Sequence, residues 1–149
     1  MFNKKNLIIL VVILILLLIS GISYVVFVPD PVESANEYLK ALENNNYEKA
    51  YSLLTEESKE KISIETMKNR YEDFYKKARI EKKDSENLIV KREDFFSANA
   101  KYRINFNSTD FGEKNYKYTM NLKRKSLINW KIKWDYNLIF PEMTEKSAF

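Results

Sequence analysis

At 149 residues the chain has room for one domain besides any membrane segment. It contains no Cys and no His, which excludes disulfides, thiol chemistry, most zinc sites and Ser-His-Asp triads within it. Its formal net charge is +4, and of its 25 basic residues Lys4 and Lys5 precede the long N-terminal apolar run, so 23 basic residues stand against 21 acidic ones beyond that run. A nucleic-acid-binding module normally carries a much stronger basic bias, so no nucleic-acid partner is expected.

The N-terminal apolar run covers residues 7–28 and contains no charge. At a rise of about 1.5 Å per residue, a helix of this length crosses a hydrocarbon core of roughly 30 Å. Basic residues ahead of such a segment stay in the cytoplasm. We therefore expect a cytoplasmic tail over residues 1–6, a single-pass transmembrane signal anchor over 7–28, and an extracytoplasmic domain after it, which locates the protein in the cell membrane.

A cleaved signal peptide is the alternative to this anchor. Small residues near a cut are provided by Ser20, Gly21 and Ser23. The apolar run continues to Val28, however, and is longer than the core of a typical signal peptide. This length favours the uncleaved anchor.

Beyond the apolar run, the first half of the chain has the hydrophobic period of helices. The first predicted helix has Asp30 as its N-cap and Pro31 in its first turn. Further helices are predicted after the asparagines at 44–46, after Thr55 and after Ser63. The apolar residues that recur at helical spacing, and that we interpret as core, are Val32, Ala35, Tyr38, Leu39, Leu42, Tyr47, Ala50, Tyr51, Leu54, Ile64, Met67, Tyr71, Phe74 and Ala78.

The second half alternates between apolar and polar residues, which is the period of strands with one buried face. The predicted strands cover residues 96–106, 116–122 and 128–134, with a shorter strand at 88–90 beside them. Gly112 falls in the first connection, and residues 123–126 are assigned to the second. Helices followed by an antiparallel meander that packs on them predict an α+β fold with a curved sheet.

A search for catalytic, cofactor-binding and metal-binding residues finds none. Gly21 and Gly112 are the only glycines, so no Gly-rich phosphate loop can be written. Ser58 and Lys61 match a Ser-x-x-Lys pattern, but the segment is highly charged and its partner motifs are missing, so Ser58 is interpreted as solvated surface. The acidic residues are scattered among lysines and are interpreted as surface charge, not as metal ligands.

One cationic feature is predicted on the polar face of the sheet. The residues that fall there are Lys101, Arg103, Lys117, Lys131 and Lys133. Neighbouring strands would gather them into a single patch. A solvated face that keeps the protein soluble is the simpler interpretation, and the alternative is a docking face for an acidic partner, such as an anionic wall polymer or another domain.

The C-terminal segment carries a more specific pattern. Trp130, Trp134 and Asp135 are followed by an apolar stretch that ends in Phe140 and Pro141. This pattern resembles the end of the NTF2-like N-terminal domain of class B penicillin-binding proteins, which precedes the transpeptidase in methicillin-resistance-type enzymes of Gram-positive bacteria.

Other segments resemble the same family. Residues 38–41, followed by 46–51 and by Leu53 and Leu54, look like its first two helices. Thr109 with Gly112 and Glu113 is similar to its Thr-x-x-Gly-Glu turn. The resemblance extends over residues 31–142, which is nearly all of the chain beyond the apolar run.

The resemblance implies an NTF2-like cone over residues 29–142 that lifts a transpeptidase off the membrane and is itself non-catalytic. It therefore implies a spacer and platform in peptidoglycan synthesis and β-lactam resistance, with no enzyme activity and no cofactor in this chain. Structural roles follow for Trp130, Trp134 and Phe140. The implied partners are the membrane, through the N-terminal helix, and a transpeptidase domain in cis or in trans, or other envelope proteins.

Several alternatives stay open at this point. Residues 143–149 are either a C-terminal tail or a truncated linker, so the chain is either the N-terminal piece of a transpeptidase or a stand-alone module. A scaffold component of an envelope secretion or conjugation complex is a second function, because some of those also join one membrane helix to an NTF2-like domain. Small-ligand binding is a third, because this fold often forms an apolar pocket.

Overall fold

The computed structural model describes residues 9–19, 30–126 and 129–139. Residues 9–19 are helical, and no helix within the described ranges has the length and hydropathy needed to cross a membrane. Half of the predicted membrane segment at 7–28 lies outside the described residues, and the predicted tails at 1–6 and 143–149 lie wholly outside them. Anchoring therefore stays a prediction.

Four helices of the domain follow one another from residue 31, and each begins at a side-chain cap. They are α2 (Pro31–Glu43), α3 (Tyr47–Ser52), α4 (Glu56–Lys61) and α5 (Ile64–Lys77). Their N-caps are Asp30, Asn46, Thr55 and Ser63, and each cap oxygen accepts a backbone N–H of the first turn. The predicted helix starts are thereby confirmed.

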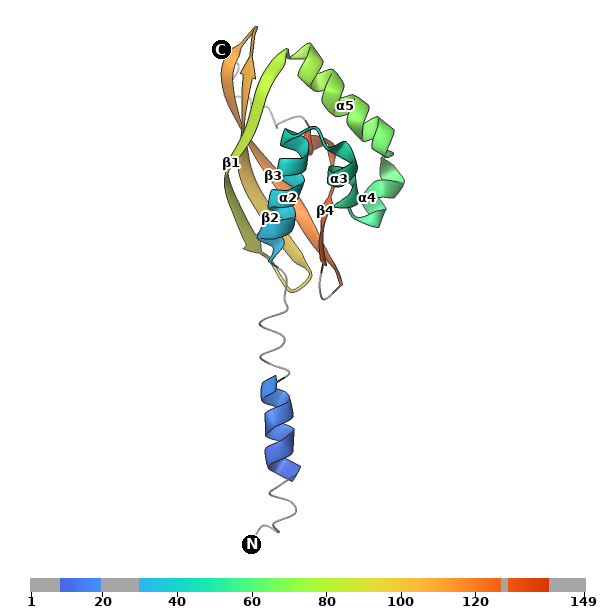
Figure 1. Cartoon of the computed structure of the whole chain (residues 1–149), viewed down its shortest axis with the longest axis vertical. Helices are drawn as coiled ribbons and strands as arrows, with labels where there is room; N and C mark the ends of the chain where they lie inside the picture. The colour runs from blue at the N-terminus through green and yellow to red at the C-terminus, as the bar shows by residue number, and fades with distance from the viewer. Residues whose placement is uncertain (1–8, 20–29, 127–128, 140–149) are drawn as a thin grey trace.

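The strands form one antiparallel sheet in the order β1-β2-β3-β4, which confirms the predicted meander (Figure 1). They are β1 (Ile80–Arg92), β2 (Ser97–Ser108), β3 (Gly112–Ser126) and β4 (Asn129–Lys133). Because the strands are antiparallel, the β1–β2 and β3–β4 connections lie at one end of the sheet and the β2–β3 turn lies at the other. A short 3-10 helix, η1 (Tyr136–Leu138), follows the sheet.

Strand boundaries differ from the sequence prediction at several positions, and β3 begins at Gly112, which was predicted to lie in a connection. The strand predicted at 88–90 is 13 residues long, because its charged first half pairs with β2 in spite of having no apolar period. Residues 123–126 belong to β3 instead of to a connection, with Lys123 paired to Lys131 and Arg124 to Trp130. Ile128, predicted as a strand residue, lies outside the described residues.

Phe96 was predicted to start the buried face of its strand, and this is wrong. Its side chain is 64% exposed. The Asp94 carboxylate accepts the backbone N–H groups of Phe96 and Ser97, so it holds a turn there and the strand starts only at Ser97.

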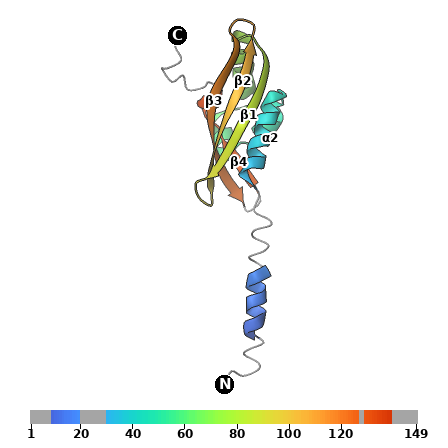
Figure 2. The ribbon, with the colours of Figure 1, turned by 90° about the vertical axis from the view of Figure 1, so that its left-hand side faces the viewer.

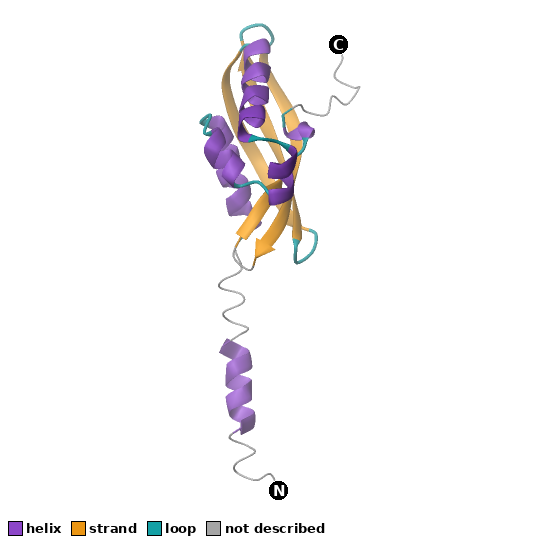
Figure 3. Ribbon diagram, turned by 90° about the vertical axis from the view of Figure 1, so that its right-hand side faces the viewer, coloured by secondary structure: helices purple, strands orange, loops and turns teal. Residues whose placement is uncertain are grey.

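One face of the sheet packs on the helices, so the molecule has two layers (Figures 2 and 3). The core between them takes alternate residues of the strands and one stripe of each long helix. Its most deeply buried large side chains include Tyr38, Leu54, Met67, Tyr71, Met120, Leu122, Trp130 and Ile132. The predicted α+β arrangement is confirmed.

The free edge of β4 is covered by the segment between α3 and α4. The Thr55 N–H donates to the Ile132 carbonyl at 2.9 Å, and the Ile132 N–H donates to the Leu53 carbonyl at 2.9 Å. Leu54 thus forms an isolated parallel bridge to Ile132. This pairing covers the β4 edge at Ile132 and fixes the start of α4 against β4.

Candidate functional site

The C-terminal pattern residues lie at the seam between the sheet and the helices. Trp130 and Trp134 are buried, at 2% and 8% exposure, so both belong to the core. Asp135 caps η1, because its carboxylate accepts the Asn137 N–H at 2.8 Å. Phe140 and Pro141 lie outside the described residues.

Trp134 is held through Ser58, a residue that sequence reasoning placed on the solvated surface. That interpretation is wrong, because Ser58 is only 2% exposed. The backbone N–H of Trp134 donates to the Ser58 hydroxyl oxygen at 2.9 Å, and the hydroxyls of Ser58 and Thr55 lie 2.7 Å apart. Most of the charged residues of α4 face solvent, whereas Ser58 lies on the side of the helix that packs against the end of β4. Ser58 is therefore a structural group and not a nucleophile in a cleft.

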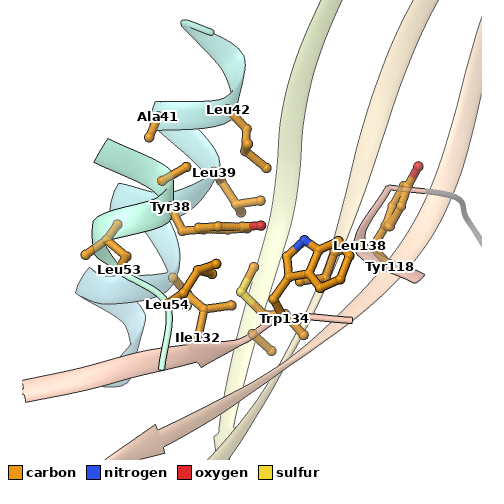
Figure 4. Close-up of a cluster of buried hydrophobic side chains, with 14 of the residues drawn as sticks. Tyr38, Leu39, Ala41, Leu42, Leu53, Leu54, Tyr118, Ile132, Trp134 and Leu138 are labelled. Atoms are coloured by element: carbon orange, nitrogen blue, oxygen red, sulfur yellow. The ribbon is translucent and has the colours of Figure 1, made fainter. Parts of the chain in front are cut away.

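Several tyrosine side chains are buried in the core, and Figure 4 shows two of them, Tyr38 and Tyr118, among the other hydrophobic residues around them. The hydroxyls of Tyr38 and Tyr71 are 3.2 Å apart, and Tyr71 also donates to the Leu138 carbonyl at 3.3 Å. Tyr102 and Tyr118 stack face to face from β2 and β3, with ring centroids 5.5 Å apart. Burial raises the pKa of all four phenols well above the ordinary value, so they remain neutral.

Sequence reasoning placed these tyrosines in the core by their period, but it found no signal for the hydroxyl contacts of Tyr71 with Tyr38 and with the Leu138 carbonyl. Those contacts join residues far apart in the chain. Within the described residues, the buried hydroxyls of Tyr102 and Tyr118 have no hydrogen-bond partner. The arrangement offers buried neutral hydroxyl groups, and the contacts of Tyr38, Tyr71 and Leu138 can stabilise a rigid interior.

A groove of about 490 Å³ lies between the end of α2, α5 and the start of β1. Lys83 lines this groove: its ammonium lies 3.7 Å from the centre of the Tyr75 ring and donates to the Asn45 side-chain oxygen at 2.6 Å. Burial lowers the pKa of the Lys83 ammonium to about 8. The Glu43 carboxylate accepts from the Ser85 N–H at 2.6 Å and from its hydroxyl. Sequence reasoning missed this site, because its residues come from three separate elements.

The predicted cationic residues lie on the sheet face that points away from the helices. Lys101 and Arg103 lie two residues apart on the same face of β2, and Arg103 is directly opposite Lys117 of β3. Glu86 of β1 is the other cross-strand neighbour of Arg103. Within the described residues, no carboxylate forms an ion pair with Lys101, Arg103 or Lys117.

The remaining two cationic residues lie near the other edge of the sheet. Lys133 is exposed on β4, while the Lys131 ammonium turns to the Ser52 carbonyl at 2.9 Å. The structure therefore brings Lys101, Arg103 and Lys117 together and separates Lys131 from them. Docking of an acidic partner on this face stays a prediction.

No group of three or more acidic side chains that could hold a metal ion is found within residues 9–19, 30–126 and 129–139. A family model described as the NTF2-like N-terminal transpeptidase domain matches residues 30–147. A comparison with curated proteins finds no match for the chain. The matched range covers the helices, the sheet and the C-terminal tryptophan pattern.

Proposed function

The chain belongs to the family of NTF2-like N-terminal transpeptidase domains, and we propose that it is a membrane-anchored, non-catalytic spacer and platform of penicillin-binding-protein type. In this role it supports cell-wall peptidoglycan synthesis and β-lactam resistance by holding a transpeptidase domain, in cis or in trans, at a set distance from the membrane. The charge-free run at 7–28 with Lys4 and Lys5 before it supports the anchor.

The interior packing is the observation that carries this proposal. A spacer must keep its shape under load, and a ligand-binding cone must keep a space open. Here Tyr38, Tyr71 and Trp134 fill the centre at 0%, 2% and 8% exposure. Hydrogen bonds between their elements join α2, α4, α5 and the chain after β4 into one body.

The decisive experiment combines an antibody to the domain with fluorescent penicillin on membranes of the source cells. Membranes are washed with carbonate, cross-linked with a short amine-reactive reagent and separated by size. We expect the antibody signal to stay in the washed membranes and to coincide with a penicillin-labelled band, either directly or only after cross-linking. The first case corresponds to a transpeptidase in cis and the second to one in trans.

Two results would contradict the proposal. The first is an antibody signal that carbonate releases from the membranes, because the chain would then not be anchored. The second is an anchored chain that shares no band with a penicillin-labelled protein before or after cross-linking. A band at the size of this chain, 17.8 kDa, that itself carries the label would overturn the non-catalytic part.

A further inference from the structure

The connection between β1 and β2, residues 93–96, exposes two adjacent aromatic side chains. Phe95 and Phe96 are 40% and 64% exposed. Their rings pack edge to face with centroids 4.8 Å apart, so they form one apolar unit. We call residues 93–96 the hairpin tip.

The backbone of the hairpin tip is fixed by its own hydrogen bonds. The Asp94 carboxylate accepts the Phe96 N–H at 2.6 Å and the Ser97 N–H at 2.7 Å. The Phe96 carbonyl accepts the Arg124 N–H from β3 at 2.8 Å. The two rings are thus presented by a closed turn, and no ordering of the backbone is needed when they meet a partner.

Basic residues surround the hairpin tip. They are Lys91 and Arg92 at the end of β1, and Lys123, Arg124 and Lys125 at the end of β3. The Arg124 guanidinium lies 4.4 Å from the centre of the Phe95 ring. The acidic groups nearby are Glu93 and Asp94, of which Asp94 holds the turn, together with two residues of α4. Glu56 pairs with Lys125 at 3.0 Å, and Glu57 lies close enough to Lys123 to interact with it electrostatically.

Apolar rings at the centre with basic groups around them match the chemistry of a lipid surface. Aromatic rings enter the boundary between headgroups and acyl chains, and Lys and Arg bind the anionic headgroups. Single exposed apolar residues are ordinary on a protein surface. Two adjacent exposed phenylalanines form a contiguous apolar patch, and such patches mark sites of interaction with a partner or a membrane.

The hairpin tip lies at the end of the domain where α2 begins (Figures 1 and 2). The membrane segment that the proposed function includes ends at residue 28, two residues before the cap of α2. Two residues span at most about 7 Å. The end of the domain that carries the hairpin tip therefore lies next to the bilayer, while the β2–β3 turn with Phe111 lies at the far end.

We propose that the hairpin tip is a second membrane contact, in which Phe95 and Phe96 enter the outer-leaflet interface and fix the tilt of the domain on its anchor. This inference rests on the anchoring part of the proposed function. The contact gives the domain a second attachment to the membrane besides its anchor, which would fix the orientation of a spacer that positions a second domain.

The test uses the absence of native cysteine in this chain. Full-length Glu93→Cys and Thr109→Cys variants, each spin-labelled, are reconstituted in vesicles of phosphatidylcholine and phosphatidylglycerol. Glu93 is at the hairpin tip, and Thr109 is exposed in the β2–β3 turn. We expect the label at 93 to be several-fold more accessible to oxygen than to a water-soluble nickel complex, and the label at 109 to show the reverse.

Matched variants then assign the contact to the two rings. In the Glu93→Cys background, Phe95→Ser with Phe96→Ser should return the label to water, while Phe111→Ser, which removes an equally exposed ring at the far end, should leave it immersed. If the label at 93 is as accessible to the nickel complex as the label at 109, the inference is overturned, but the proposal that the chain is anchored is not affected. Low accessibility to both reagents at 93 also overturns the inference, because the tip is then buried against protein. A chain that carbonate strips from the vesicles overturns the anchor itself.

Discussion

The Tyr38 and Tyr71 hydroxyls meet at 3.2 Å at the centre of the fold, and this contact joins the first long helix to the last. Tyr71 extends the contact to the Leu138 carbonyl beyond the sheet. Three parts of the chain that are separate in the sequence are thereby joined in the dry interior. Buried hydrogen bonds of this kind are costly to leave half-made.

Replacement of Tyr71 by Phe should destabilise the domain without changing its shape. The ring and its packing remain, but the Tyr38 hydroxyl and the Leu138 carbonyl each lose their partner. We expect the free energy of unfolding to fall by about 1–3 kcal/mol, the cost of buried unsatisfied polar groups. Urea unfolding followed by tryptophan fluorescence measures it, since Trp130 and Trp134 are both in the core.

Tyr136→Phe is the matched control for this substitution. Tyr136 is 52% exposed and stacks under the Arg70 guanidinium at 4.2 Å, a contact that Phe keeps. The free energy of unfolding of Tyr136→Phe should be within about 0.5 kcal/mol of that of the original chain, as for an ordinary surface substitution. Equal effects of the two substitutions would show that the central hydroxyl contacts contribute nothing.

Ser58→Ala should be destabilising although the sequence around it is highly charged. The substitution leaves the buried Trp134 N–H without the oxygen that accepts it at 2.9 Å. We expect a loss of about 1–3 kcal/mol in the free energy of unfolding. Ser52→Ala serves as the control, because within the described part of the chain the Ser52 hydroxyl bonds only the exposed Lys49 carbonyl of its own helix. A Ser58→Ala curve that overlaps the control would contradict the structural role.

The sequence could predict those features of the fold that depend only on residues close together in the chain. The helix starts at Asp30, Thr55 and Ser63 follow from a cap and the turn after it, and the buried faces of β2 and β3 follow from their alternation. The tryptophan pattern, with Trp130 and Trp134, also identified the family before any coordinates, and the family match agrees.

The rest depends on partners that are distant in the chain. Ser58 is buried because Trp134 packs on it, 76 positions away. The first half of β1 is a strand because its backbone pairs with β2. Its own sequence does not alternate between apolar and polar residues, so it carries no local strand signal. Lys83 meets Asn45 and Tyr75 across three elements. A local pattern holds no information on any of these contacts.

Gly112 is the first residue of β3 and has a φ of +66°, a backbone conformation that residues with a Cβ rarely adopt. A Cβ built there meets nothing within 4 Å, so an added side chain would cause backbone strain without a clash. Gly112→Ala should therefore lower the free energy of unfolding by about 1–2 kcal/mol. Gly112→Asn should cost less, since Asn tolerates the left-handed region. Equal losses in urea unfolding for Ala and Asn would argue against strain as the cause.

The Lys83 ammonium gives the domain a measurable pH dependence. Burial lowers its pKa in the folded protein from 10.5 to about 8. Between these values the unfolded chain still holds the proton and the folded protein has lost it, so the unfolded state binds more protons. Stability then rises with pH across this window, because the slope of the unfolding free energy with pH has the sign of that difference.

Lys83→Met isolates this contribution, because Met keeps the apolar stem over Tyr75 and carries no charge. We expect the stability of the original chain, relative to Lys83→Met, to increase from pH 7.5 to pH 9.5. Tyrosine ionisation cancels, since both chains contain the same tyrosines. Lys82→Met removes a charge from the exposed neighbouring position. The free energy of unfolding of this variant should change with pH in the same way as that of the original chain. If the stability of Lys83→Met has the same pH dependence as that of the original chain, the partly buried ammonium is compensated by groups such as Glu43, and the groove carries no pH-sensitive charge.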